Sequence, residues 1–130
     1  MSDKVLTADL IVDFLLDGPH ADDLARELQA SEVDARKLWV DAVAVAEACR
    51  LLALVDPPLP PRTIADALAR FLVLSGIRST EREALLNALD EYGRTDRSFP
   101  EAWWTQQAVL FGASILPATV HVGDALEKTE

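Results

Sequence analysis

Residues 32–54 read EVDARKLWVDAVAVAEACRLLAL and form the most apolar segment of the chain. From position 38 to position 54 only Asp41, Glu47 and Arg50 are charged, and five of the other residues are alanine. A helix that is apolar almost all round belongs in the middle of a bundle rather than on its surface. The stretch therefore predicts a central helix over 32–54, with Ser31 as its N-cap and the other segments packed about it.

Apolar residues at helical spacing, bounded by capping residues, glycine and proline, predict further helices. We expect them at 8–17, 21–29, 63–74, 80–92 and 98–111, with Ser75-Gly76 at the end of the helix at 63–74. A capping box of Ser98 and Glu101 would open the last helix, Gly112 would end it, and Glu47 and Arg50 would form an i, i+3 ion pair. Four prolines between positions 57 and 61 exclude a helix there and predict a stiff connector. No internal repeat is evident. The sequence thus predicts an all-α single domain of about six helices over residues 1–120, with residues 121–130 as a frayed acidic tail.

Length and composition suit one ordinary domain. The chain has 130 residues and half of them are apolar, so a proper core can form without metals or disulfides. The single cysteine, Cys49, lies in the most apolar segment, which predicts a buried free thiol in a reducing compartment. Asp9 and Asp13 interrupt the apolar run near the N-terminus, so we expect no signal peptide. No apolar stretch approaches the roughly 20 residues that span a bilayer, and we expect a cytoplasmic protein without membrane insertion.

The net charge is −10. A surface this acidic repels phosphate backbones, which argues against nucleic-acid binding. Residues 1–56 hold twelve acids and five bases, a net of −7, and the remainder holds ten acids and seven bases, a net of −3. The bias toward the N-terminal part points to a partner with a basic surface, although an ordinary role in solubility is the more common explanation.

Three aspartates recur along the first expected helix. Asp9, Asp13 and Asp17 are spaced i, i+4, i+8 and would share one line on its surface. One interpretation is a recognition stripe for lysine or arginine on a partner, and the other is a solvated face. Such a line offers too few oxygens for calcium, which takes 6–8 ligands, so no metal site is predicted.

Two tryptophans, Trp103 and Trp104, are adjacent in the last expected helix. Neighbours in a helix point about 100° apart, so both rings can be fully buried only if the helix is covered on two sides. One ring is therefore a candidate for an exposed aromatic anchor that a partner covers. The alternative is that both rings are half-buried, with their indole N–H groups reaching polar partners.

Motifs of catalysis and cofactor binding are absent from the sequence. His20 and His121 lie at opposite ends of the chain, and there is no glycine-rich phosphate loop, HExxH, GxSxG or CxxC. We therefore predict no catalytic residue, no cofactor and no metal, and we do not expect an enzyme.

Four segments between residues 37 and 117 carry a resemblance: KLWVDAVAVAEACRLL, DPPLPPR, TEREALLNALDEYG and FPEAWWTQQAVLFGASILP. In this order they resemble a family of small, alanine-rich, helical bacterial proteins, some of which lie near type VI secretion genes. The chain departs from the family pattern in having one tryptophan rather than two in the first segment, and LFGAS where an aromatic residue and two glycines are expected. The resemblance implies a helical accessory protein without an assigned activity, and no functional residue carries over.

Together these observations predict a non-catalytic module for protein–protein interaction, of the accessory, adaptor or inhibitor kind. The contact would involve Asp9, Asp13 and Asp17, or Trp103 and Trp104. A first alternative is a binder of small molecules, or an enzyme, with a pocket between helices lined by Trp39 and Trp103. A second alternative is a structural subunit that self-associates.

Overall fold

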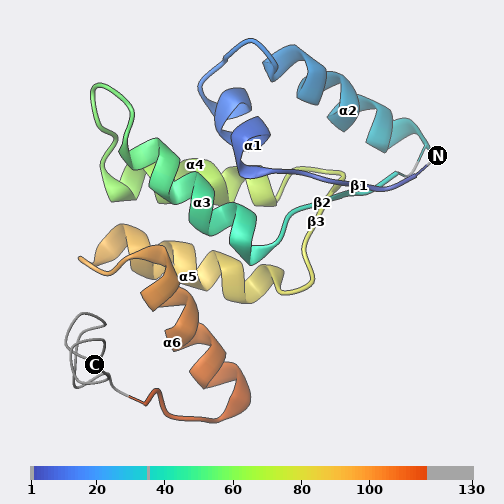
Figure 1. Cartoon of the computed structure of the whole chain (residues 1–130). Coiled ribbons are helices and arrows are strands. Elements are labelled where there is room, and N and C mark those ends of the chain that lie inside the picture. The colour runs from blue at the N-terminus through green and yellow to red at the C-terminus, as the bar shows by residue number, and fades with distance from the viewer. Residues whose placement is uncertain (1, 35, 117–130) are drawn as a thin grey trace, which may run out of the picture.

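Helices make up most of the structure, which the computed structural model describes over residues 2–34 and 36–116 (Figure 1). These residues form six helices and three strands of two residues each, which confirms a mostly helical, all-α type of domain with about six helices. The tail expected at 121–130 lies outside the described residues. In chain order the elements are β1 (Lys4–Val5), α1 (Ala8–Leu15), α2 (Ala21–Asp34), β2 (Leu38–Trp39), α3 (Ala42–Ala53), α4 (Pro61–Leu72), β3 (Ile77–Arg78), α5 (Arg82–Arg94) and α6 (Phe99–Phe111).

The elements form three consecutive units, each of one strand and two helices. The strands pair in parallel in the order β1-β2-β3, with Lys4 opposite Leu38 and Leu38 opposite Ile77. This repeat was not predicted, because strands of two residues leave no alternating pattern and the helices carry different side chains. The repetition is therefore one of structure and not of sequence.

The three units share a position in the core. The fourth residue of every helix in the described part of the chain is almost fully buried, with at most 1% of its surface exposed. These residues are Ile11, Leu24, Val45, Ile64, Leu85 and Ala102. Each helix thus enters the common core with its first turn, whatever its later turns contact.

The single helix predicted over 32–54 is wrong in its first half. Its first residues end α2, Leu38 and Trp39 form the middle strand of the sheet, and α3 begins only after Asp41. The Asp41 carboxylate accepts a hydrogen bond from the backbone N–H of Ala44 at 2.8 Å, which makes Asp41 the N-cap of α3. A continuous apolar run does not distinguish a short buried strand from a buried helix, and here the run contains both.

Ser31 does not start a helix. It lies within α2, where 4% of its surface is exposed and its hydroxyl donates to the Leu28 carbonyl oxygen at 2.7 Å. Ser and Thr in a helix interior commonly satisfy their hydroxyl in this way. The cap expected at Ser31 is therefore absent, and the central helix that it was to open begins about ten residues later, at Ala42.

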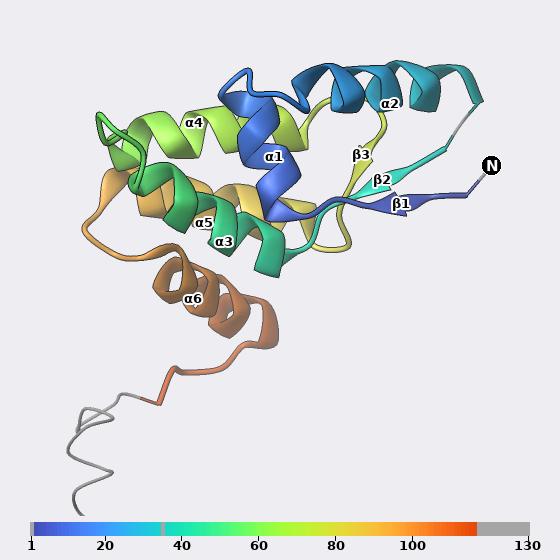
Figure 2. The ribbon, with the colours of Figure 1, turned by 45° about the horizontal axis from the view of Figure 1, so that its top comes forward.

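Helix α3 still lies in the middle of the helical layer, where it packs against α1, α4 and α6. Figure 2 shows α6 on the far side of α3 and α5 from α2. One side of α3 remains open, since Val43 has 76% of its surface exposed. The expectation that α3 is covered all round is wrong on this side, and the opening there forms the candidate site.

Candidate functional site

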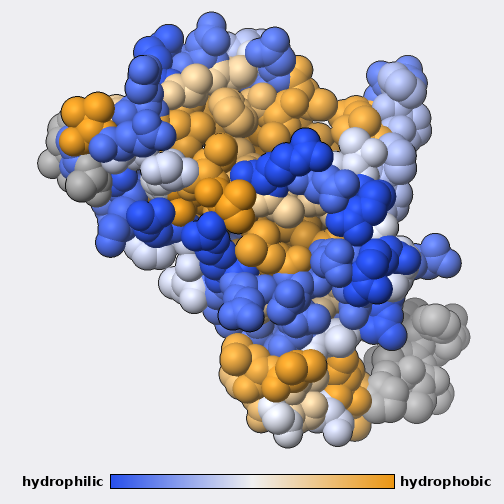
Figure 3. Space-filling view, turned by 180° about the vertical axis from the view of Figure 1, so that it is seen from behind, coloured by the Kyte–Doolittle hydropathy of each residue, from blue (hydrophilic) through white to orange (hydrophobic). Residues whose placement is uncertain are grey.

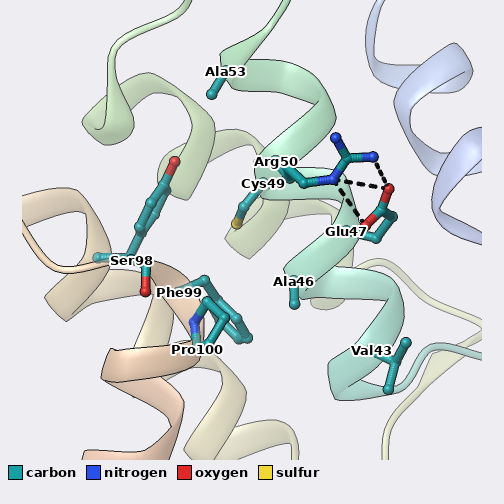
Figure 4. Close-up of a pocket in the computed structure, with 10 residues that line it drawn as sticks. Val43, Ala46, Glu47, Cys49, Arg50, Ala53, Ser98, Phe99 and Pro100 are labelled. Carbon is teal, nitrogen blue, oxygen red and sulfur yellow. Dashed lines mark hydrogen bonds and ion pairs between the residues drawn. The ribbon is translucent and has the colours of Figure 1, made fainter. Parts of the chain in front are cut away.

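A groove lies between α3 and the start of α6 (Figure 4). Its volume is about 530 Å³, which falls within the usual range of roughly 300–1,000 Å³ for binding sites. Its lining comes from α3, from α5 and from the start of α6: Val43, Ala46, Glu47, Cys49, Arg50, Ala53, Tyr92, Ser98, Phe99 and Pro100. Most of these side chains are apolar, so the groove suits an apolar ligand group.

Helix α3 supplies one wall of the groove. Val43, Ala46, Arg50 and Ala53 are spaced three and four residues apart, so they lie along one face of the helix. The two alanines are small, which leaves space that larger side chains would have filled. Ala46 and Ala53 therefore line an open surface, whereas Ala44 and Ala48 of the same helix are buried in the core.

The start of α6 forms the opposite wall, and its position is fixed by a predicted capping box. The Ser98 hydroxyl accepts from the backbone N–H of Glu101 at 3.3 Å, and Glu101 Oε1 accepts from the backbone N–H of Ser98 at 3.0 Å. The hydrogen bond with the Ser98 backbone lowers the pKa of Glu101. Phe99 follows the cap with 2% of its surface exposed, and its ring stacks on Trp103 at 6.3 Å between centroids.

A smaller hollow of about 160 Å³ extends the groove toward the two adjacent tryptophans. It shares four lining residues with the groove and adds Ala42, Trp103 and Trp104. Because the two hollows share part of their walls, they form one apolar surface along α3 and α6. We refer to both together as the α3–α6 groove.

The two tryptophans differ in exposure. Trp103 is partly buried and packs against the core, whereas Trp104 has 57% of its surface exposed at the end of the α3–α6 groove. Of the two interpretations of the sequence, the structure therefore agrees with the one in which a single ring is exposed, and not with the one in which both rings are half-buried. Trp104 is therefore available to a partner, while Trp103 helps to hold α6 in place.

An ion pair marks the rim of the groove. The Arg50 guanidinium Nε donates to both carboxylate oxygens of Glu47 at 3.1 Å, and the expected i, i+3 pair is confirmed (Figure 4). The hydrogen bond from Arg50 lowers the pKa of Glu47, so the pair stays charged at neutral pH. Because each charge is matched by the other, the rim adds polarity without an unpaired charge.

The thiol and the phenol in the lining are not poised for catalysis. Burial raises the pKa of the Cys49 thiol to about 12, and burial likewise raises the pKa of Tyr92. The thiolate is the nucleophilic form of cysteine, so a thiol that stays protonated is inert. Cys49 therefore acts as a small apolar side chain of the core, as its place in the sequence predicts.

This gives a direct prediction for thiol chemistry. In the folded protein at pH 8, Cys49 is expected to react with a thiol-specific disulfide reagent about 1,000-fold more slowly than in guanidinium, because its pKa lies about three units higher than the ordinary 9.0. The absorbance of the released thiolate measures both rates. Equal rates in the two solutions would contradict a buried thiol.

The three aspartates do not share one line. Asp9 is exposed on α1, whereas Asp17 follows the end of α1 with a left-handed φ of 55°. Asp13 holds the turn into α2, since its carboxylate accepts a hydrogen bond from the backbone N–H of His20. The regular spacing of the stripe is broken where α1 ends at Leu15, and Asp9 and Asp17 remain as exposed acids.

Trp39 lies outside the lining of the groove. Its indole N–H donates to Asp3 Oδ2 at 3.1 Å, and hydrogen bonds from the Lys37 backbone and from Trp39 lower the pKa of Asp3. Trp39, in β2, thus does not join Trp103, in α6, in lining the α3–α6 groove. The pocket between helices exists, but Phe99 and the α3 face line it instead.

Val43 and Ala46 were expected to pack against a neighbouring helix, and not to line an open groove. Both lie in the run that was interpreted as buried on all sides, and nothing in that pattern marks the side left open. Phe99 was also missed, because its place as the first residue of α6 does not indicate whether its side chain enters the core. The exposed side of α3 depends on where α6 lies, which is a property of the tertiary fold.

Comparisons with family models, with curated proteins and with solved structures found no match to this chain. Among residues 2–34 and 36–116, no three histidine, cysteine, aspartate or glutamate side chains are grouped so that they could hold a metal ion. The helices in the same ranges are all too short or too polar to cross a membrane. The α3–α6 groove is thus the feature on which a functional proposal can rest.

Proposed function

We propose that this protein is a non-catalytic interaction module that binds another protein through the α3–α6 groove. The observation that carries the proposal is the continuous apolar surface from Ala53 to Trp104, which combines an open helix face with an exposed tryptophan. Tryptophan is enriched among the few residues that contribute most of the binding energy at protein interfaces. The inert Cys49 thiol supports binding rather than catalysis.

The partner element that suits this surface best is an amphipathic helix. The open face of α3 runs from Val43 to Ala53, which is about 15 Å or three helical turns. An amphipathic helix docks in such a groove with apolar side chains at i, i+3, i+4 and i+7. The net charge of −10 favours a partner whose polar face is basic, and Asp9 and Asp17 offer exposed carboxylates to it.

The proposal places the protein in the bacterial cytoplasm as an accessory, adaptor or inhibitor-like component. A free, buried cysteine is compatible with a reducing compartment. The resemblance described above adds a possible setting near type VI secretion. Nucleic acid is not a proposed partner, because the acidic surface repels it.

Two substitutions test the groove. Val43→Glu and Trp104→Ala are each expected to weaken partner binding about 10-fold or more, because each removes an exposed apolar contact at the centre or the end of the groove. The partner is first identified by purifying the tagged protein from its native cells and analysing what is retained by mass spectrometry. Calorimetric titration of the purified pair then gives the affinities.

Val33→Glu is the matched control, since Val33 is also exposed, at 86%, but lies on α2. It should bind the partner as the unmodified chain does, and all three variants should unfold at the same denaturant concentration. If Val43→Glu and Val33→Glu bind equally well, the groove is not the contact surface. Asp9→Lys and Asp17→Lys in the same titration test the acidic contact.

A second candidate function is the binding of a small apolar molecule. The volume of about 530 Å³ and the mostly apolar lining favour it. A ligand that binds the folded state raises the midpoint of thermal unfolding by linkage, so a thermal-shift screen would reveal it. If a compound raises the midpoint of thermal unfolding of the unmodified chain but not that of Val43→Glu, the groove is the binding site of that small molecule.

A further inference from the structure

The end of α6 carries a second apolar surface, separate from the groove. Its members are the last three residues of the helix and two residues that follow: Val109, Leu110, Phe111, Ile115 and Leu116. We call them the α6 apolar end. Between 48% and 93% of the surface of each residue is exposed, and Figure 3 shows the apolar patch at the bottom of that view.

The directions and the exposed fractions of these side chains together show that the rest of the described chain does not cover them. Val109, Leu110 and Phe111 are consecutive, so they point about 100° apart around the helix. Each is nevertheless at least 60% exposed, which means that the last turn of α6 projects beyond the body of the domain. An apolar turn that is open on all sides calls for a partner that can surround it.

We propose that two copies of this chain pair through their α6 apolar ends in a symmetric dimer. The charge distribution favours a second copy over other partners. The chain carries a net charge of −10, so contact between most of its surfaces would bring acids against acids. Residues 102–116 contain no charged side chain, and this surface can meet its own copy without repulsion. A two-fold interface needs such a self-complementary patch.

The exposed area suits a weak, reversible dimer. The five side chains present on the order of 600 Å² per copy, or roughly 1,200 Å² for the pair, which lies at the lower limit of stable protein interfaces. Interfaces near this lower limit are typical of weak and transient complexes. Monomer and dimer should therefore both be present at ordinary working concentrations.

The proposed dimer contact is centred on a different turn of α6 from the α3–α6 groove. Trp104, at the end of the groove, and Phe111, in the α6 apolar end, are seven residues apart, which corresponds to about 10 Å along the helix. The groove contacts the first turns of α6 and the dimer contacts the last turn. Self-association thus goes beyond the proposed function. If the dimer does not form, the proposed binding of a partner in the α3–α6 groove is not affected.

Sedimentation velocity over a concentration series tests the pairing. The full chain is expected to change from monomer to dimer, and Phe111→Glu and Leu110→Glu are each expected to raise the dissociation constant about 100-fold, because each introduces a charge that meets its own copy. Both residues are exposed, so the variants should fold normally. Val33→Glu and Val43→Glu add the same charge elsewhere and should leave the dimer unchanged.

Crosslinking identifies the occupant of the α6 apolar end. A photoreactive phenylalanine analogue is placed at position 111, and the full chain is prepared as a mixture of ¹⁵N-labelled and unlabelled copies. Crosslinks that join labelled to unlabelled α6 support the pairing. A chain that stays monomeric at every concentration, a dimer that persists in Phe111→Glu, or crosslinks confined to one copy, for instance to residues 117–130, would each overturn it.

Discussion

Replacing Gly76 by alanine is expected to lower the free energy of unfolding by about 2–5 kcal/mol, because the added methyl group meets two separate obstacles. Gly76 has a φ of +91°, a region that residues with a Cβ adopt only with strain. A Cβ at this position would also lie 2.1 Å from the Ser31 hydroxyl oxygen. That hydroxyl is held by its hydrogen bond to the Leu28 carbonyl, so it cannot simply turn away.

The contact matters because it joins distant parts of the fold. Ser31 lies near the end of α2, and Gly76 directly precedes β3. The Gly76 carbonyl oxygen accepts a hydrogen bond from the backbone N–H of Leu38 at 2.9 Å, which connects the same point to β2. A shift of the Gly76 backbone to relieve the clash would therefore disturb the pairing of β2 with β3.

Gly112→Ala is the matched control for this experiment. Gly112 also has a positive φ, of 61°, but within the described chain no neighbouring atom lies within 4 Å of the position that its Cβ would take. Only the backbone cost of about 1 kcal/mol is expected there. Urea unfolding followed by circular dichroism measures both variants, and equal losses would show that the close approach to Ser31 contributes nothing. The double variant Ser31→Gly/Gly76→Ala should recover part of the loss.

The sequence predicted those elements whose signals are local. The Ser98 capping box, the end of α6 at Gly112 and the Glu47–Arg50 pair all depend on residues within one or two turns, and all are confirmed. Gly76 was interpreted only as the end of a helix, since its close approach to Ser31 arises from packing between segments far apart in the chain. Contacts of that kind leave no local pattern.

The sequence analysis missed the strands and the α3 wall of the groove for a related reason. Leu38 and Trp39 pair with residues on β1 and β3 that are more than thirty positions away, and two residues are too few to show the alternation of a strand. Val43 is apolar in sequence and open in the structure because α6 ends up beside only part of α3. Adjacent tryptophans on one helix cannot share a single buried face, so the sequence marked one of the two rings as a candidate for exposure, but it did not indicate that this ring is Trp104.

Replacing Phe71 by alanine is expected to lower the free energy of unfolding by about 3–5 kcal/mol. Phe71, on α4, has 2% of its surface exposed and meets the ring of Phe14 on α1 edge to face, with 5.7 Å between centroids. The substitution removes the burial of a whole ring and leaves a cavity between the first and second units. A domain of this size has only about 5–15 kcal/mol of stability, so the variant should unfold at a much lower urea concentration.

Phe111→Ala provides the comparison within the same chain, because it removes the same side chain from a position that is 71% exposed. Its free energy of unfolding should change by no more than about 0.5 kcal/mol when it is measured at a concentration where the chain is monomeric. Similar losses at the two positions would contradict the placement of Phe71 in the core. A double-mutant cycle with Phe14→Ala separates the ring contact from the cavity, and we expect about 1 kcal/mol of coupling between the two rings because aromatic pairs contribute beyond the area that they bury.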